Sequence, residues 1–172
     1  MEPAVASAAV LSAAIAPESA GDNAEVMALV ERAFGPGRYA KAAERLREGN
    51  AFIPDLSFTA REDGRLVGTV RLWPVRVGER EALLLGPIAV DPDARNKGVG
   101  ATLVERACEA AARAGHAVVL LVGDAPYFAR MGFAALEPGR LVLPGPADPR
   151  RTLVKALKPG ALDGLGGQVT LP

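Results

Sequence analysis

Apolar residues along the chain follow two periods, one typical of strands and one typical of helices. Residues 56–62 and 66–77 read as strands, and Asp63-Gly64 between them is a typical hairpin turn. Residues 83–90 and 117–122 are almost continuously apolar, which predicts strands buried on both faces of a sheet. Gly86-Pro87 lies inside the first run, and we expect it to break the regular ladder and to splay this strand from its parallel neighbour.

Helical spacing appears in two long segments. The first begins at a capping Asp22 or Asn23 and ends at Gly35-Pro36-Gly37, where the pattern breaks. The second starts in a glycine turn around residue 98, repeats apolar residues every four positions from Val99 to Ala111, and closes at Gly115. Shorter helices are predicted at about residues 38–48 and 125–131.

A strand, a crossover helix and a second strand follow one another between residues 83 and 122. This order predicts a βαβ unit with parallel pairing, and therefore an α/β fold. Further strands are expected at about residues 8–15, 133–143 and 151–157, while residues 160–172 are expected to cover an edge of the sheet. Ligands of such sheets bind at the carboxyl ends of the strands, which here are residues 90–100 and 122–127.

The composition fits one enzyme-sized domain. The chain has 172 residues, of which 49% are hydrophobic, so we expect a single domain over residues 1–172 with tails at about 1–7 and 161–172. Twenty basic residues balance twenty acidic ones, which argues against nucleic acid or an anionic membrane as a partner.

The N-terminal sequence and the single cysteine indicate a cytoplasmic protein. The apolar run at residues 4–16 is too short to span a bilayer, and Glu2 stands where a signal peptide carries positive charge. A lone Cys108 excludes an internal disulfide and suits a reducing compartment. Cys108 lies on the apolar stripe of a predicted helix, so we expect a core residue rather than an acyl carrier. We expect a monomer or a homodimer.

Arg95, Gly98 and Gly100 stand at the spacing R-x-x-G-x-G, between a strand and a helix. The first turn of a helix has unpaired amides and a positive dipole end, and glycine lets a phosphate approach them closely. The turn would therefore hold a diphosphate, although the same spacing also suits a turn that uses glycine only for its shape. A dinucleotide-binding G-x-G-x-x-G motif is excluded because position 103 is Leu103.

Two segments resemble the GNAT acyltransferases. Residues 95–100, RNKGVG, are similar to the Q/R-x-x-G-x-G/A motif of that superfamily, and residues 127–133, YFARMGF, are similar to its Y-x-x-x-G-F segment. Residues 85–92 and 122–127 look most like the YhbS-like branch of predicted N-acetyltransferases, and the likeness covers about residues 8–160. The resemblance implies a GNAT-like mixed, mostly antiparallel twisted sheet with a central parallel βαβ unit and helices on both faces.

The resemblance also implies an activity and a set of site residues. The activity is N-acetyl transfer from acetyl-CoA to a primary amine of a small molecule or peptide, by direct attack in a ternary complex and without a metal. The strand before the motif would pair with the pantetheine arm, and the amides of the motif would hold the pyrophosphate. The implied cofactor-binding residues are Ile88, Ala89, Val90, Arg95, Asn96, Lys97, Gly98, Val99, Gly100, Ala101, Asp124, Tyr127 and Phe128.

The chain departs from the family at the catalytic acid. The usual tyrosine, which protonates the leaving thiolate, lies four residues before the glycine of G-F, and that position is Phe128 here. Tyr127 lies one residue earlier, which turns a helical side chain by about 100°. Tyr127 is therefore the acid after a shift of helix register, or else a packing or cofactor contact while water protonates the thiolate. The alternative to an enzyme is a non-catalytic acyl-CoA-binding sensor or scaffold.

Candidates for the general base and the acceptor pocket are weaker. Asp124 lies at a strand exit but also suits a helix cap, and His116 follows a helix away from the expected site. Glu62, Glu81 and ordered water complete the list of possible bases. The possible acceptor contacts, each also explained by core packing or a solvated strand face, are Phe34, Tyr39, Phe52, Arg71, Trp73 and Arg76.

Overall fold

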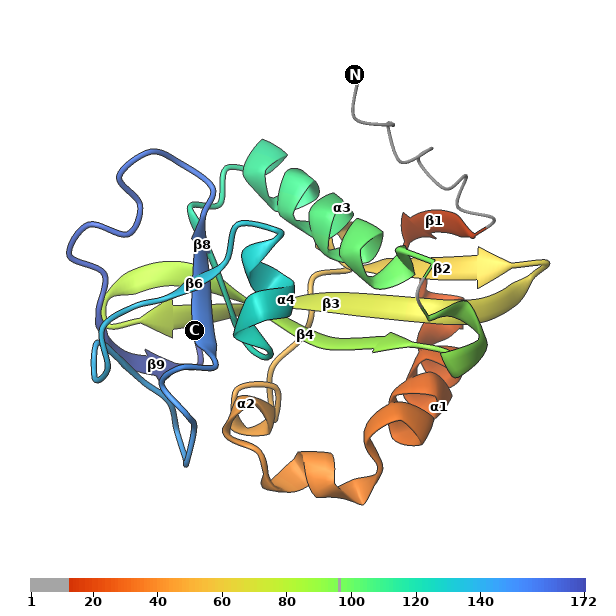
Figure 1. The fold of residues 1–172 in the computed structure, drawn as a ribbon, viewed down its shortest axis with the longest axis horizontal. Coiled ribbons are helices and arrows are strands. Elements are labelled where there is room, and N and C mark those ends of the chain that lie inside the picture. Colours follow the sequence, from red (N-terminus) through yellow and green to blue (C-terminus); the bar gives the residue numbers. More distant parts are fainter. Residues whose placement is uncertain (1–12, 96) are drawn as a thin grey trace, which may run out of the picture.

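A twisted mixed sheet forms the centre of the molecule. The computed structural model describes residues 13–95 and 97–172. Within these ranges the strand order is β1 (Ala14–Pro17), β2 (Phe58–Glu62), β3 (Arg65–Val77), β4 (Arg80–Val90), β5 (Val118–Val122), β8 (Thr152–Ala156) and β6 (Ala134–Ala135). Neighbours along this order are antiparallel except β4 and β5, which are parallel (Figure 1). The predicted mixed, mostly antiparallel sheet with a parallel βαβ unit is confirmed.

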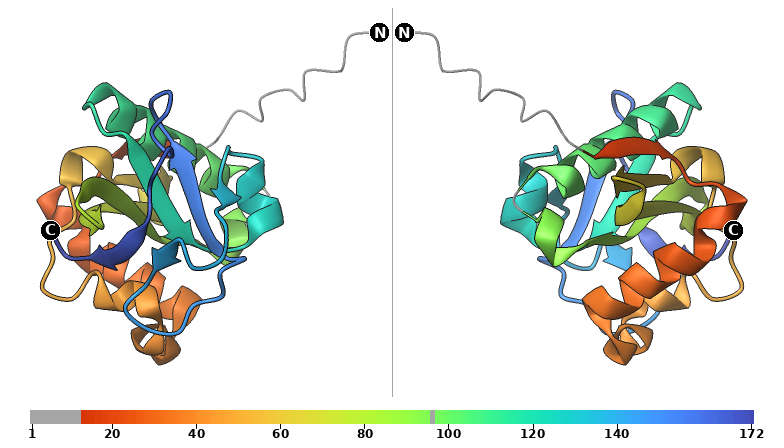
Figure 2. Two further views of the ribbon diagram at one scale, coloured as in Figure 1. Left: turned by 90° about the vertical axis from the view of Figure 1, so that its left-hand side faces the viewer. Right: turned by 90° about the vertical axis from the view of Figure 1, so that its right-hand side faces the viewer.

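Helices cover both faces of this sheet (Figures 1 and 2). One face packs against α3 (Val99–Arg113) and α4 (Ala125–Ala129), and the other against α1 (Asn23–Phe34) and α2 (Ala42–Arg45). Successive residues of a strand point to opposite faces, so Leu83 and Leu85 of β4 join the α3 core while Leu84 joins the core beside α2. This arrangement explains the continuous apolar runs of β4 and β5.

The residues predicted to make turns and helix ends adopt the expected conformations. Asp63 and Gly64 both have positive φ, of 50° and 78°, as a two-residue hairpin between β2 and β3 requires. α1 starts at Asn23 and ends at Gly35, whose φ of 63° stops the helix. Gly68 in β3 lets α3 lie close, because a Cβ there would be 2.9 Å from Leu103 Cδ1.

The C-terminal segment adds structure beyond the expected tail. Strand β9 (Gly167–Thr170) pairs with β3 at Arg76 and Val77, and also runs parallel to β7 (Leu141–Val142). Leu165 and Val169 are buried. The segment expected to cover an edge of the sheet, residues 160–172, therefore does so through strand β9, which pairs with β3.

Three predicted elements have different bounds. The helix expected at residues 38–48 is instead a 3-10 helix at Pro36–Ala40 and the short α2, because Lys41 between them has an extended backbone. The strand expected at 133–143 is divided into β6 and β7 by a turn at Gly139, which has a φ of 87°. The strand expected at 8–15 begins at Ala14 and runs to Pro17, and residues 8–12 lie outside the described part of the chain.

Candidate active site

The parallel pair β4–β5 opens toward its carboxyl end. The register joins Leu83 to Val119 and Leu84 to Leu120, although β4 continues to Val90 and β5 to Val122. The splay expected at Gly86-Pro87 is therefore present, and it leaves an edge of β4 without a parallel partner within the described residues. The Trp73 indole N–H donates a hydrogen bond of 2.6 Å to the Gly86 carbonyl oxygen. Trp73 thus supports the irregular part of β4 rather than lining a pocket.

A cavity of about 550 Å³, here called the α3 cavity, lies at the start of α3. Gly98 precedes the helix with a φ of 79°, a left-handed conformation that favours glycine. Residues 98–101 all line the cavity, and amides at this end of a helix have no acceptor inside the helix. The other lining residues are Val90, Ala94, Arg95, Glu105, Tyr127, Arg130 and Met131. This geometry fits an anionic group of diphosphate size.

A side chain added at Gly100 would collide with the lining of the α3 cavity. A Cβ on Gly100 would lie 2.9 Å from the Tyr127 hydroxyl oxygen and 3.5 Å from Val90 Cγ2. Tyr127 therefore reaches over the first turn of α3, and its phenol lies beside the amides of that turn. Partial burial raises the pKa of Tyr127, so its hydroxyl is protonated at neutral pH and can donate a hydrogen bond.

A second cavity of about 690 Å³, here called the splay cavity, lies where β4 and β5 diverge. Four separate segments build it: the end of α1 with the 3-10 helix and α2, residues 85–88 of β4, the end of β5 with Phe128, and the loop at residues 146–151. Val122, at the end of the otherwise buried β5, is 36% exposed. The two cavities meet the same strand, since Ile88 lines the splay cavity and Val90 the α3 cavity.

Tyr127 and Phe128 are neighbours in α4, but they line different cavities. Tyr127 lines the α3 cavity, whereas Phe128 is buried and lines the splay cavity. The Phe128 ring makes edge contacts with Tyr127 and Phe133, with centroids 4.9 and 6.0 Å apart. Gly123 makes room for it, because a Cβ there would be 2.5 Å from Phe128 Cε2. The side chain at the family's usual tyrosine position therefore has no proton to give.

Charged side chains on the splay cavity are mostly basic. Arg38, Lys41, Arg47 and Arg151 line it together with Asp148. Glu44 lies between the first and third of these arginines, with its oxygens 3.7 Å from Arg38 Nη1 and 2.9 Å from Arg47 Nη1. Sequence reasoning missed this cluster, because no local motif connects residues 38–47 with residues 148–151. It also missed Arg130 of the α3 cavity.

Several predicted site residues lie outside both cavities. Asp124 caps α4 by accepting a hydrogen bond of 3.0 Å from the Tyr127 amide, and Lys97 forms an ion pair of 4.0 Å with Glu62. Ala89 packs on the side of α1. Asn96 lies outside the described residues. The remaining positions that were considered but line neither cavity are Tyr39, Phe52, Arg76, Glu81 and His116, whereas Phe34 lines the splay cavity.

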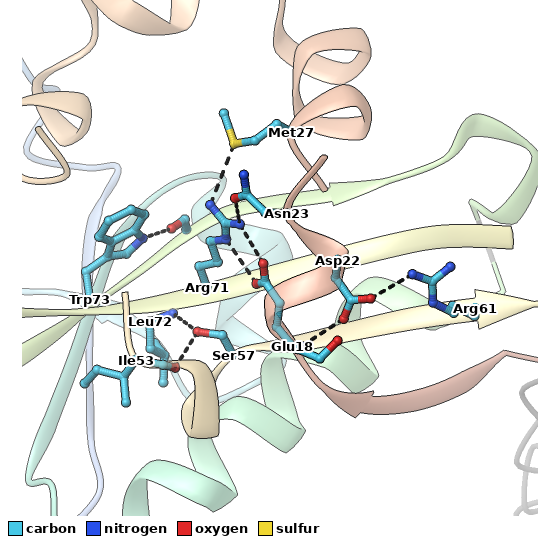
Figure 3. A network of polar contacts seen from close by, with 12 residues as sticks. Glu18, Asp22, Asn23, Met27, Ile53, Ser57, Arg61, Arg71, Leu72 and Trp73 are labelled. Atoms are coloured by element: carbon cyan, nitrogen blue, oxygen red, sulfur yellow. Dashed lines mark hydrogen bonds and ion pairs between the residues drawn. The ribbon is translucent and has the colours of Figure 1, made fainter. Parts of the chain in front are cut away.

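Arg71 is buried and fully engaged in another network (Figure 3). Its guanidinium donates to both carboxylate oxygens of Glu18, at 3.0 and 2.6 Å, and to Asn23 Oδ1 at 2.9 Å. It also stacks 4.0 Å from the ring centroid of Phe52. Arg71 therefore joins β3 to the start of α1 and does not reach a cavity.

Cys108 is buried on the core side of α3, as expected. Burial raises the pKa of its thiol to about 11, so the thiolate needed for acyl transfer is scarce at neutral pH. The described ranges contain no group of three or more His, Cys, Asp or Glu side chains that could hold a metal ion. Among the helices of the described residues, none has the length and apolarity needed to cross a bilayer.

The known proteins that resemble this chain in sequence are acetyltransferases. The model of the acetyltransferase (GNAT) family matches residues 23–133. The uncharacterized N-acetyltransferase YhbS of Escherichia coli K12 is 30% identical over 151 residues, covering 86% of this chain and 89% of YhbS. The uncharacterized N-acetyltransferase YjhQ of the same strain is 32% identical over 116 residues, and the match spans 65% of this chain and 64% of YjhQ.

Solved structures agree with these matches. The crystal structure of E. coli YhbS in complex with CoA has a TM-score of 0.80 at 29% identity, covering 94% of this chain and 91% of that one. A GNAT acetyltransferase from Brucella melitensis in complex with acetyl-CoA has a TM-score of 0.60, also at 29% identity, with 88% and 98% covered.

Proposed function

We propose that this chain, which belongs to the acetyltransferase (GNAT) family, moves an acetyl group from acetyl-CoA to a primary amine by direct attack in a ternary complex. Family membership makes it an acyltransferase whose cosubstrate is a CoA thioester. Acceptors in this family are amines, such as those of small molecules or peptides. The observation that carries the proposal is that β4 has an open edge, whose last residue Val90 lines the same cavity as the first turn of α3.

The geometry fits the carrier in three parts. The amides of residues 98–101 would hold the diphosphate, and Arg95 and Arg130 on the same cavity add positive charge. The open edge of β4 from Ile88 to Val90 would pair with the amides of the pantetheine arm, as an added strand would. When bound, acetyl-CoA supplies an activated thioester, whose acetyl end we assign to the splay cavity.

The protein's own contribution is then mainly positioning. Holding the amine and the thioester together in one cavity replaces a bimolecular encounter, a gain that can reach about 7–11 kcal/mol. We assign no side chain as base: Asp148 lines the cavity, but hydrogen bonds from Arg150 lower the pKa of its carboxyl and weaken it as a base. The cavity is open, so water relays the amine proton and protonates the leaving thiolate.

The place of Tyr127 supports a cofactor contact. A catalytic acid must reach the sulfur, which we assign to the splay cavity, whereas the Tyr127 hydroxyl lies beside Gly100 in the α3 cavity. From there it would donate a hydrogen bond to a phosphate oxygen. We also propose that the chain acts as one domain over residues 1–172 and in the cytoplasm, which its single buried cysteine and balanced charge support.

Two measurements test the proposal. Isothermal titration calorimetry should show binding of CoA and acetyl-CoA, and a thiol reagent should detect release of CoA when a panel of primary amines is added. Binding without release on any amine would favour the alternative, a non-catalytic acyl-CoA sensor. Absence of binding would contradict both.

A further inference from the structure

The lining of the splay cavity carries a positive charge that acetyl-CoA does not neutralise. Four basic side chains and one acidic side chain line the cavity in the described part of the chain. The phosphates of the carrier are assigned to the α3 cavity, and the thioester end that enters the splay cavity is uncharged. An anionic group on the acceptor would suit this lining.

Arg47 is the cation nearest the irregular part of β4. Its Nη2 lies 2.8 Å from the position that a Cβ on Gly86 would occupy, so the guanidinium rests against the backbone where the strands diverge. Nη1 donates to Glu44 at 2.9 Å, but Nη2 makes no hydrogen bond to any described residue. The side chain is only 14% exposed, so this donor group has lost most of its water.

Two guanidiniums share Glu44 in this cluster, whereas Glu31 contacts only Arg38, with its Oε2 3.5 Å from Arg38 Nη2. Glu44 lies between Arg47 and Arg38, whose side chain is 8% exposed. The Nε atoms of both arginines are buried and have no hydrogen-bond partner among the described residues. Burial lowers the pKa of Arg47, Glu44 opposes this effect, and the charge of Arg38 adds to it. Arg47 therefore shares its one carboxylate partner among the described residues and keeps donors that a bound anion would satisfy.

Arg71 shows what a structural arginine looks like in the same molecule. Both Glu18 oxygens and Asn23 accept hydrogen bonds from its guanidinium (Figure 3), and the Phe52 ring stacks on it. Arg38 comes close to this state, because Glu31, Glu44 and both the hydroxyl and the ring of Tyr39 contact its guanidinium. Arg47 has Glu44 alone among the described residues, and its remaining donors adjoin a cavity.

From this arrangement we propose that the amine acceptor carries a carboxylate close to its reactive amine. Arg47 binds this carboxylate, and the nearby positive charge of Arg38 strengthens the binding. The inference rests on the proposed acetyl transfer. A carboxylate matches the planar fork of a guanidinium and would accept from Nη2 beside Gly86, which holds the amine next to the thioester. Arg47 thereby acts as a specificity-determining residue.

Bisubstrate analogues test this without knowledge of the natural acceptor. In each analogue the sulfur of CoA is joined through an acetyl linker to the amine of a probe. The first matched pair carries glycine or glycinamide, and the second carries aspartic acid α-amide or asparagine amide. We expect at least one acidic analogue to bind at least about tenfold more tightly than its neutral partner, because a charge-assisted hydrogen bond is gained. Preference for glycine indicates a free amino acid, and preference for the aspartyl probe indicates an acidic peptide.

Single-residue variants test whether Arg47 causes the preference for the acidic analogues. Arg47→Gln should reduce the acid-to-amide preference to about one while leaving the affinity for CoA unchanged. Arg113→Gln, at the exposed end of α3, removes the same charge far from the cavity and should keep the preference. Thermal denaturation of each variant checks that it is folded, and Arg38→Gln should reduce the preference partly.

The outcomes separate this inference from the proposed function. Equal affinity of the wild-type protein for acid and amide in both pairs would overturn the carboxylate assignment, and this comparison needs no variant. An unchanged preference in Arg47→Gln would overturn the role of Arg47, and equal weakening of acid and amide would indicate that it contacts the acetyl group instead. Failure of CoA itself to bind would instead contradict the proposed function.

Discussion

The α3 cavity and the splay cavity are built in opposite ways. One short part of the chain, with Ala94, Arg95 and residues 98–101, supplies more than half of the residues that line the α3 cavity, and the binding groups that we assign to it are backbone amides. Four distant segments form the splay cavity, and its polar groups are side chains. Backbone amides suit a group that is the same in every reaction, whereas side chains can change with the acceptor. The comparison suggests a constant carrier site beside a specific acceptor site.

The largest effect is expected where an arginine serves the fold rather than a cavity. Arg71→Met should destabilise the protein by about 3–5 kcal/mol, because Glu18, whose side chain is 1% exposed, loses its buried counter-charge. Arg47→Met should cost less than about 2 kcal/mol, since Glu44 keeps Arg38 as a partner. Chemical denaturation of both variants measures the difference. Equal losses would mean that Arg47 is as structural as Arg71.

A carboxylate placed in the α3 cavity should remove carrier binding. Gly100→Glu would put a bulky negative group against Tyr127 and the phosphates, and we expect CoA affinity to fall at least about a hundredfold, or 2.7 kcal/mol. Gly21→Glu adds the same charge at an exposed site where a Cβ meets nothing within 4 Å, so it is the matched control. Calorimetry measures the affinity and circular dichroism the fold. Unchanged affinity in the Gly100 variant would contradict the cradle assignment.

A smaller change is expected when only the Tyr127 hydroxyl is removed. Tyr127→Phe should raise the KM for acetyl-CoA by about three- to tenfold, the value of one hydrogen bond, and leave kcat unchanged. Burial raises the pKa of Tyr127, so a catalytic role would make kcat fall at high pH as the hydroxyl ionises. Steady-state kinetics across pH distinguish the two roles. A large loss of kcat, together with loss of this alkaline limb in the variant, would restore Tyr127 as the acid.

The smallest effect is expected at Cys108. With a pKa of about 11 in the folded protein, its thiol should not react with a disulfide reagent at pH 8 during a time that fully labels the unfolded chain. Cys108→Ala should keep kcat within about twofold, because the residue lies in the core of α3 and outside both cavities. Rapid labelling of the native protein, or inactivation upon labelling, would indicate that α3 opens or that the thiol takes part in catalysis.

The same difference between the cavities explains what the sequence could predict. Gly98 and Gly100 follow an apolar strand and precede a periodic helix, so the α3 cavity follows from one local pattern. The β2–β3 hairpin and the βαβ unit follow from equally local signals. Arg38, Arg47 and Asp148 carry no such pattern, because they meet only when α2 and the loop at residues 146–151 close over β4.

The errors in the sequence reading have a related cause. The helix expected at residues 38–48 breaks because Arg38, Glu44 and Arg47 turn inward to form a buried ion cluster, and pattern analysis places charged residues on the surface. Strand β9 was missed because several glycines surround the two buried apolar residues of this segment, Leu165 before the strand and Val169 within it, and because the pairing of β9 depends on the distant strand β3. Tertiary contacts decide both cases.

The proposed carrier site depends on main-chain N–H groups at the start of α3 that hold the diphosphate. Amide NMR of the ¹⁵N-labelled protein during titration with CoA observes these groups individually. We expect the largest chemical-shift changes on the amides of residues 98–101, and no such changes with S-acetylpantetheine, which has no diphosphate. Saturating binding of CoA with these amides unperturbed would show that the diphosphate is held elsewhere.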